Sequence, residues 1–276
     1  MEDIIKAIVL GTIQGLTEFI PISSTAHLRI IPALLGWKDI GAAYTAVIQI
    51  GTLIATLIYF KKDIFSLSNG FIQAFKKKDF LSNFESRIFI LIIIGTIPIS
   101  VCGLLFKRFI EGEARGLYVI SAALILLAIV LYIAEKVSSK RKDLSEITFK
   151  DGIVIGCAQA LALIPGSSRS GVTITAGLFR GLKRDVAARY SFLLSIPAIA
   201  LSGLYELYKE REVLLDENLL SLSVATIVSG VVGYLSIAFL INYLKTRSNL
   251  IFIIYRIALG ILILILLSQG ILQNLE

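Results

Sequence analysis

The chain is poor in charged residues, and this scarcity argues against a soluble protein. Only 17% of its 276 residues are charged, whereas soluble domains carry about 25%. Hydrophobic residues make up 56%, and several apolar runs approach the ~20 residues that cross a bilayer. We therefore interpret the chain as an integral membrane protein. Its net charge of +7 is assigned to cytoplasmic loops, and no nucleic-acid partner is expected.

Cysteine and histidine are also scarce. The two cysteines, Cys102 and Cys157, lie in apolar runs without a CxxC or Cys/His spacing. They are interpreted as buried, inert thiols that say nothing about the redox compartment. His27 is the only histidine. The first apolar run has no small-residue cleavage site after it, so we expect no removable signal peptide.

Apolar stretches of two kinds follow one another along the chain. Some have the length of a full membrane span: 42–60, 88–106, 117–135, 186–208, 218–243 and 250–272. Two others, 4–35 and 152–182, are interrupted by prolines and by hydroxyl-bearing residues. Non-helical backbone at membrane depth is tolerated only where protein or a water-filled cavity covers it. The two interrupted segments are therefore the candidates for lining a site.

The two interrupted segments resemble each other. G-T-I-Q-G-L-T-E-F-I-P-I-S-S spans 11–24, and G-C-A-Q-A-L-A-L-I-P-G-S-S spans 156–168. One gap opposite Glu18 aligns Pro21 with Pro165, and Ser23 and Ser24 with Ser167 and Ser168. We interpret this match as an internal duplication with an offset of about 145 residues.

The duplication constrains the topology. If each broken segment enters and leaves on one side, each half crosses the membrane an odd number of times, and the second half is inverted. The prediction is an all-α polytopic helix bundle, a single transmembrane domain over 1–276. Its inverted repeats, about 1–140 and 150–276, each hold a re-entrant broken helix pair plus three spans. The side with 61–87 and 136–151 collects about twice as many Lys and Arg as the other, which predicts that it is cytoplasmic and that both termini are outside.

The second break, PGSSRSGVTI over 165–174, predicts an oxyanion cradle. Arg169 is a cation at membrane depth, where charge is costly and usually functional. Its guanidinium is a planar fork of donors that suits phosphate oxygens. Hydroxyls and the free N–H groups of a helix start add neutral donors. The predicted phosphate-binding residues here, besides Arg169, are Ser168, Ser170, Gly171 and Thr173. The alternative is a structural arginine that only pairs with Glu18.

The first break supplies complementary chemistry. Gln14 and Glu18 are four residues apart and share one helix face. The Glu18 carboxylate could hold a divalent cation or accept a proton. Four further polar residues follow the proline: Ser23, Ser24, Thr25 and His27. A glutamate, a serine, a histidine and an arginine together can form a phosphoryl-transfer site with a nucleophile, a base, a metal ligand and a charge clamp.

These two regions carry a family resemblance. QGLTEFIPISSTAHL over 14–28 and PGSSRSGVTI over 165–174 resemble the two signature regions of the undecaprenyl pyrophosphate phosphatase family, the BacA type linked to bacitracin resistance. The likeness extends over nearly the whole chain. It implies a membrane enzyme, a polyprenyl-diphosphate phosphatase, that recycles the lipid carrier for peptidoglycan and other envelope polymers. It also implies inverted repeats with re-entrant helices in the bacterial cytoplasmic membrane, and a site facing outside.

The resemblance also transfers roles to single residues. The family's E/Q-x-x-x-E pattern falls on Gln14 and Glu18, and its following hydroxyl-rich segment falls on Ser23, Ser24, Thr25 and His27. Its P-G-x-S-R-S-G-x-T pattern falls on Pro165, Gly166, Ser168, Arg169, Ser170, Gly171 and Thr173. Many members have glutamate at the position of Gln14, so Glu18 is the stronger candidate for holding Mg²⁺ or Ca²⁺. Many members also have glycine where this chain has Ala26.

The expected mechanism leaves the nucleophile open. Ser24 or His27 attacks the terminal phosphorus, or His27 activates the attacking group, which could be water. Arg169, with Ser23, Thr25 and the hydroxyls of the second break, binds the phosphate oxygens. The expected partners are a polyprenyl diphosphate lipid and membrane lipids, and the sequence predicts no oligomeric state.

A transporter or flippase for a phosphorylated lipid or another anion is the rival hypothesis, since inverted repeats with broken helices are also a transporter architecture. We favour the enzyme because Glu18, Ser24 and His27 supply an acid, a nucleophile and an imidazole that a carrier does not need. A structural scaffold is a weaker alternative. Outside the breaks, Arg256 is interpreted as structural, and Tyr44, Gln49 and Glu206 are noted as residues that could line the cavity.

Overall fold

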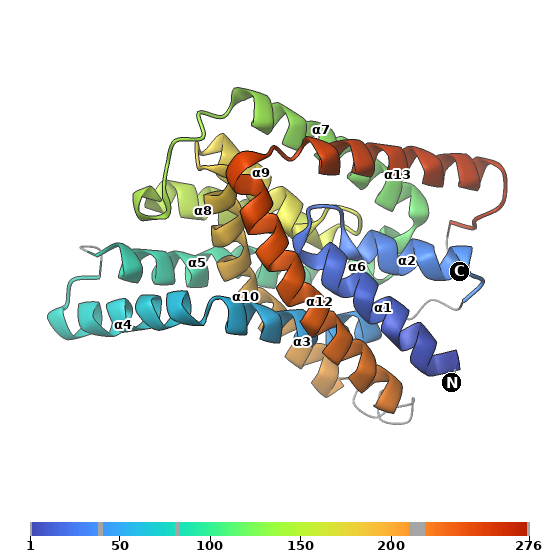
Figure 1. The fold of residues 1–276 in the computed structure, drawn as a ribbon, viewed down its shortest axis with the longest axis horizontal. Helices are drawn as coiled ribbons and strands as arrows, with labels where there is room; N and C mark the ends of the chain where they lie inside the picture. Colours follow the sequence, from blue (N-terminus) through green and yellow to red (C-terminus); the bar gives the residue numbers. More distant parts are fainter. Residues whose placement is uncertain (1, 38–40, 81–82, 210–218, 275–276) are drawn as a thin grey trace.

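A computed structural model describes residues 2–37, 41–80, 83–209 and 219–274, and it is a bundle of α-helices (Figure 1). The long helices are α3 (Gly41–Tyr59), α5 (Phe84–Leu105), α7 (Leu117–Val137), α10 (Arg184–Lys209), α12 (Leu219–Thr246) and α13 (Leu250–Ser268). Within the described ranges, 5 of them are long and apolar enough to cross a membrane. The predicted all-α polytopic membrane bundle is confirmed, and the long helices coincide with the predicted spans.

The predicted loop over 61–87 contains a helix. α4 (Lys61–Lys77) follows α3 after a bend of 72°, and it packs along α5 (Figure 1). Leu67, Gly70 and Ala74 are its buried residues, and this spacing of three and four places them on one helix face. The prediction of a loop considered only the charges of this region and therefore missed the apolar face of the helix.

Both predicted breaks are present. α1 (Glu2–Phe19) and α2 (Ser24–Leu34) form the first broken pair, and α8 (Phe149–Gln159) and α9 (Arg169–Phe179) form the second. A short 3₁₀ turn, η3 (Ala160–Leu163), continues α8. α2 and α9 have the same length, 11 residues each. In both pairs the proline lies in the connection and the new helix starts a few residues later.

The caps of α2 and α9 correct the predicted alignment by one residue. Ser23 caps α2 with φ 77°, and Ser168 caps α9 with φ 66°. Left-handed serines are uncommon, so the two caps are equivalent positions. Ser23 therefore corresponds to Ser168 and not to Ser167, and Ser24 corresponds to Arg169. The second connection has one more residue after its proline, which compensates for the gap opposite Glu18.

Each broken pair packs against the other half of the chain. α1 lies against α12, and α8 lies against α5; likewise α3 contacts α12, and α10 contacts α5. α3 and α10 contact each other, as do α7 and α13. Two halves related by an approximate two-fold axis give such reciprocal contacts. The start of α1 and the segment that follows α13 lie on the same side of the molecule (Figure 1).

The duplicated glycines explain how the broken helices approach so closely. A Cβ at Gly11 would lie 2.4 Å from the carbonyl oxygen of Ala225 on α12. A Cβ at Gly156 would lie 2.4 Å from the Cα of Gly95 on α5. Small residues allow such backbone contact between membrane helices. The duplicated Gln159 then donates from Nε2 to the Gly95 carbonyl oxygen at 3.3 Å.

The prediction of two buried thiols is wrong. Cys102 is half-buried, but Cys157 is exposed. Cys157 lies on the outer face of α8, where Ile153 and Val154 are also exposed. In a membrane bundle this outer surface contacts lipid, so an apolar sequence context does not imply burial inside the protein.

A buried carboxylate joins the ends of the second broken pair. Asp151, in the first turn of α8, has a fully buried side chain. Its Oδ2 accepts hydrogen bonds from Lys142 Nζ at 3.0 Å and from the Thr148 N–H at 3.0 Å. Its Oδ1 accepts one from Arg180 Nε at 2.6 Å, just after α9. The start of α8 and the end of α9 are therefore connected through one side chain.

Replacing Asp151 should destabilise the second broken pair. Asp151→Ala leaves two cations unpaired, but both are partly exposed and can be hydrated. We therefore expect a loss of about 2 kcal/mol, below the range for a fully buried pair. Equilibrium unfolding in detergent measures it. Glu2→Ala, which removes the exposed partner of Lys6, is the control and should change stability little. Equal effects of the two substitutions would contradict the role given to Asp151.

Candidate active site

The two breaks meet in one cavity of about 640 Å³. The first break contributes Glu18, Ser23, Ser24 and Thr25 to its lining, and the second contributes Ser168 and Arg169. α3, α5 and α10 supply most of the remaining walls. The prediction that the interrupted segments line a common cavity is confirmed.

The Glu18 carboxylate is the centre of the polar contacts. Its Oε2 accepts hydrogen bonds from Ser24 Oγ at 2.9 Å and from Gln14 Nε2 at 2.9 Å. Gln49 Nε2 on α3 contacts the same oxygen at 3.4 Å. Its Oε1 faces Arg169 Nη2 at 3.2 Å. Glu18 lies in the last turn of α1, Ser24 begins α2 and Arg169 begins α9, so the chain interruptions bring the three side chains together.

Arg169 has a further contact and an unused donor. Its Nη1 donates to the Ser191 carbonyl oxygen on α10 at 3.2 Å. Its Nε is buried and has no hydrogen-bond partner in the described part of the chain. The guanidinium is therefore fixed by two elements, while its Nε–H has no partner among the described residues. The interpretation of Arg169 as a simple ion-pair partner of Glu18 does not account for that free donor.

A second arginine, Arg256 on α13, holds the loop that carries Ser168. Its side chain is completely buried. Nη2 donates to the carbonyl oxygens of Gly166 at 3.3 Å, Ser167 at 3.0 Å and Ala123 at 3.2 Å. These contacts fix the loop against α7 and α13. The sequence marked Arg256 only as a charge inside an apolar span.

His27 lies behind the cavity wall. One ring nitrogen, Nδ1, is 2.7 Å from the Ser23 carbonyl oxygen, and Nε2 is 2.7 Å from the hydroxyl oxygen of Tyr255. The two rings are stacked, and His27 is not among the residues that line the cavity. Both ring nitrogens are thus engaged in holding the Ser23 turn. A direct attack by His27 stays a prediction, and these contacts do not favour it.

Four of the predicted phosphate ligands form hydrogen bonds that brace the start of α9. Ser168 Oγ accepts the Gly171 N–H at 3.2 Å and lies 3.2 Å from Ser170 Oγ. Thr173 Oγ1 donates to the Arg169 carbonyl oxygen at 2.8 Å. Ser170, Gly171 and Thr173 do not line the cavity. Their role as direct phosphate ligands stays a prediction, whereas Ser168 does line the cavity.

Residues on other helices complete the site. Gln49 and Glu206 line the cavity, whereas Tyr44 packs in a separate apolar cluster beside Leu10 and Val47. The Ser191 carbonyl and the Tyr255 hydroxyl were not anticipated. A polar side chain in an apolar span was the available signal for Gln49, and no pattern in the sequence indicated a backbone carbonyl as a partner of Arg169.

The donor set suits a divalent cation only together with an anionic ligand. Among the described residues, no group of three or more His, Cys, Asp or Glu side chains could hold a metal ion. Gln14 Oε1, however, is buried and has no partner, and the Glu18 carboxylate is one turn away. Mg²⁺ is commonly bound by one or two carboxylates plus substrate phosphates. Glu18, which lines the cavity, fits that pattern, and Gln14 behind it offers a neutral oxygen from outside the lining.

Comparison with known proteins agrees with this geometry. A family model described as bacitracin resistance protein BacA matches residues 7–262. A relative from Chloroherpeton thalassium, named undecaprenyl-diphosphatase, is 56% identical over 97% of this chain and 98% of its own length. Relatives with the same name come from Chlorobium phaeobacteroides, 54% identical over 97% of this chain and 98% of the relative, and from Myxococcus xanthus, 52% identical over 97% and 90%. The chain therefore belongs to the bacitracin resistance protein BacA family.

Proposed function

We propose that the chain is an undecaprenyl-diphosphatase, a membrane enzyme that converts undecaprenyl diphosphate into undecaprenyl phosphate and inorganic phosphate. The names of its relatives support this activity. The observation that carries it is the Glu18 carboxylate, which contacts a hydroxyl group at one oxygen and a guanidinium at the other, inside a cavity. In that arrangement Ser24 can act as the nucleophile, Glu18 as its base and Arg169 as the cation that binds phosphate.

Binding comes first. The terminal phosphate enters the cavity beside Arg169, whose guanidinium carries a full positive charge into the lining. Ser168 Oγ and Thr25 Oγ1 line the same wall. Arginine at the start of a helix adds a full charge to the partial charge of the free N–H groups. The prenyl chain stays in the lipid and leaves between the cavity-lining helices.

Ser24 is the nucleophile that the geometry favours. Its hydroxyl donates to Glu18 Oε2 at 2.9 Å, so Glu18 accepts the proton as Ser24 Oγ attacks the terminal phosphorus. The new bond is Oγ–P, and the bond to the bridging oxygen breaks. Undecaprenyl phosphate leaves with that oxygen. Arg169 offsets the negative charge on the transferred phosphoryl group.

Hydrolysis of the phosphoserine returns the enzyme to its starting state. Water attacks phosphorus from the side that the leaving group has vacated, the Oγ–P bond breaks, and inorganic phosphate is released. Glu18 gives its proton to Ser24 Oγ and takes the proton of the attacking water, which is lost to solvent. His27 holds the Ser23 carbonyl and thereby the turn that carries Ser24.

A divalent cation, Mg²⁺ or Ca²⁺, would be held by Glu18 and Gln14. When bound, it neutralises charge on the diphosphate oxygens. Gln14 provides a neutral carbonyl oxygen, whereas a second carboxylate would bind the cation more tightly. The cation would therefore bind weakly in the absence of the substrate.

We place the protein in the bacterial cytoplasmic membrane, with both termini and the cavity facing outside. The excess of Lys and Arg in the loops on the opposite side supports this orientation. There it would recycle the lipid carrier for envelope polymers. The contact between the Ser24 hydroxyl and the Glu18 carboxylate favours an enzyme over a transporter or flippase, because a carrier binds an anion without a nucleophile and its base.

Neutralising Glu18 should abolish most of the activity. Glu18→Gln keeps the shape of the side chain but removes the base and the negative charge, and we expect turnover to fall by about 10²–10⁴. Phosphate release from undecaprenyl diphosphate in detergent measures this change. Glu113→Gln, at an exposed glutamate outside the cavity, is the matched control. Normal turnover of Glu18→Gln would remove Glu18 from the mechanism.

The nucleophile is identified by trapping the phosphoenzyme. Substrate labelled on its terminal phosphate should label the unmodified protein at serine after rapid quenching. Ser24→Ala should lose this label, whereas His27→Gln should keep an acid-stable label that forms more slowly. An acid-labile phosphohistidine, or a label that persists in Ser24→Ala, would exclude Ser24 as the nucleophile.

Removal of divalent cations should reduce turnover. We expect EDTA to lower the activity and added Mg²⁺ or Ca²⁺ to restore it. Gln14→Glu should lower the cation concentration needed for half-maximal activity, because it adds a second carboxylate. Full activity in excess EDTA would show that Arg169 alone offsets the phosphate charge.

A further inference from the structure

The cavity holds a second ion pair, near its outer end. Lys107, the first residue of α6 (Lys107–Glu111), contacts Glu206 of α10, with 2.7 Å between Nζ and Oε1. Both side chains are mostly buried, with exposed fractions of 23% and 13%. Both line the same cavity as Glu18 and Arg169. Among the described lining residues, these four are the charged ones.

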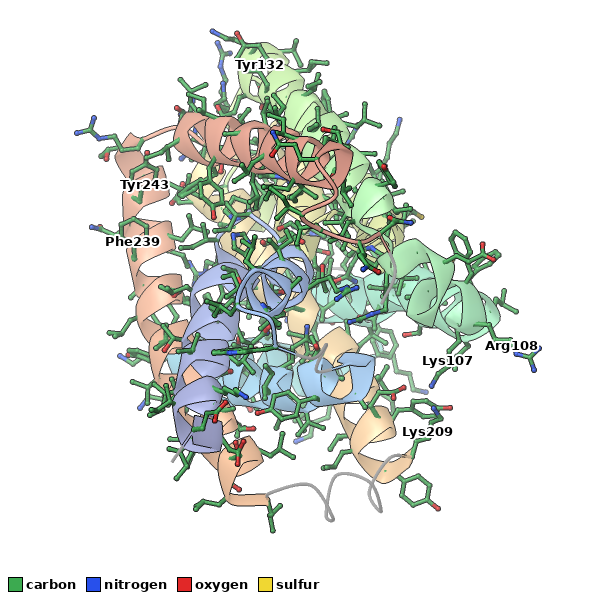
Figure 2. The ribbon with its side chains drawn as sticks, turned by 90° about the vertical axis from the view of Figure 1, so that its right-hand side faces the viewer. Lys107, Arg108, Tyr132, Lys209, Phe239 and Tyr243 are labelled. Carbon is green, nitrogen blue, oxygen red and sulfur yellow. The ribbon has the colours of Figure 1, made fainter. Side chains whose placement is uncertain are left out.

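The position of Lys107 is unusual for a lysine at the end of a membrane helix. Such side chains normally extend to the aqueous interface. Lys107 instead lies over the ring of Tyr205, 4.3 Å from its centre, and reaches Glu206. Figure 2 shows Lys107 directed toward the end of α10 near Lys209, whereas Arg108 is directed away from the bundle. Glu206 and Tyr205 thus hold an ammonium group at the cavity instead of in solvent.

The wall between the two ion pairs offers no other cation. It is formed by Ile99, Ser100, Gly103 and Leu104 on one side and by Ala198, Leu201 and Ser202 on the other. An anion that moves outward from Arg169 therefore meets no positive side chain of the lining before Lys107. A passage that has hydroxyl groups but no other charge, with a cation at each end, favours two binding positions for one anion, since a phosphate between them would have no positive charge to offset its own.

We propose that Lys107 is a second phosphate-binding residue, which takes the diphosphate group on entry and the inorganic phosphate on exit. This inference rests on the proposed function for the identity of the substrate. Lysine is suited to such a transfer because its ammonium is a point charge on a flexible stem. Glu206 carries a single negative charge, so a phosphate with more charge displaces it from Lys107. When the phosphate leaves, the ion pair between Lys107 and Glu206 forms again.

The role predicts a defect in binding and not in the chemical step. Lys107→Gln should raise the Kd for inorganic diphosphate and the KM for undecaprenyl diphosphate by about tenfold, as expected for one charge-assisted contact, with kcat unchanged. Lys107→Arg should restore both constants. Glu206→Gln should tighten diphosphate binding, because it removes the competing carboxylate. A purely structural ion pair would give the same loss for either substitution.

Titration calorimetry on the full chain in detergent, with inorganic diphosphate as the probe, tests this without turnover. The Lys107→Gln/Glu206→Gln double variant removes both charges of this ion pair together, and it should still bind weakly. Arg108→Gln is the matched control and should bind like the unmodified protein. Equal affinity of Lys107→Gln and the unmodified protein, or no binding to the latter, would overturn the inference. A chain that binds diphosphate through Lys107 but releases no phosphate from the lipid would instead overturn the proposed function.

Discussion

The ion pair between Glu18 and Arg169 is the constraint on which the rest of the structure depends. Each charge alone inside an apolar bundle would cost several kcal/mol, so the two must meet. They lie 151 positions apart in the chain, one at the end of α1 and the other at the start of α9. Their pairing therefore fixes the two breaks against each other. The Ser24 hydroxyl is positioned as a consequence, because Glu18 Oε2 accepts its hydrogen bond.

The fold holds both breaks open by covering them with protein. Gly11 and Gly156 let α1 and α8 touch the backbone of neighbouring helices, and Arg256 accounts for loop carbonyls that would otherwise be unpaired. Left-handed serines at the two caps turn the chain into α2 and α9. Such strained residues persist only where the surroundings determine them. Here the strained serine backbone allows the first residues of α2 and α9 to face the cavity.

The sequence predicted the helices and the meeting of the breaks, because hydropathy and duplicated motifs record both directly. It failed where partners are distant in the chain or share no pattern. The Tyr255 hydroxyl beside His27 and the Ser191 carbonyl beside Arg169 belong to this class. The cap correction has another cause. Aligning the two prolines pairs Ser23 with Ser167. The second connection, however, has one more residue after its proline, so its helix starts one residue later and the equivalent cap is Ser168.

The two cations of the cavity differ in a way that gives it a direction. Arg169 is held by a carboxylate and a carbonyl on different helices, so its planar fork has one orientation, which suits a reaction that needs fixed charge. Lys107 contacts the Glu206 carboxylate and the ring of Tyr205, and its four-carbon stem is flexible. A rigid guanidinium at the inner end and a flexible ammonium at the outer end would let a phosphate move from one cation to the other before it is fully hydrated. A pair of arginines would bind as well but release more slowly, since each bidentate contact must break two hydrogen bonds together.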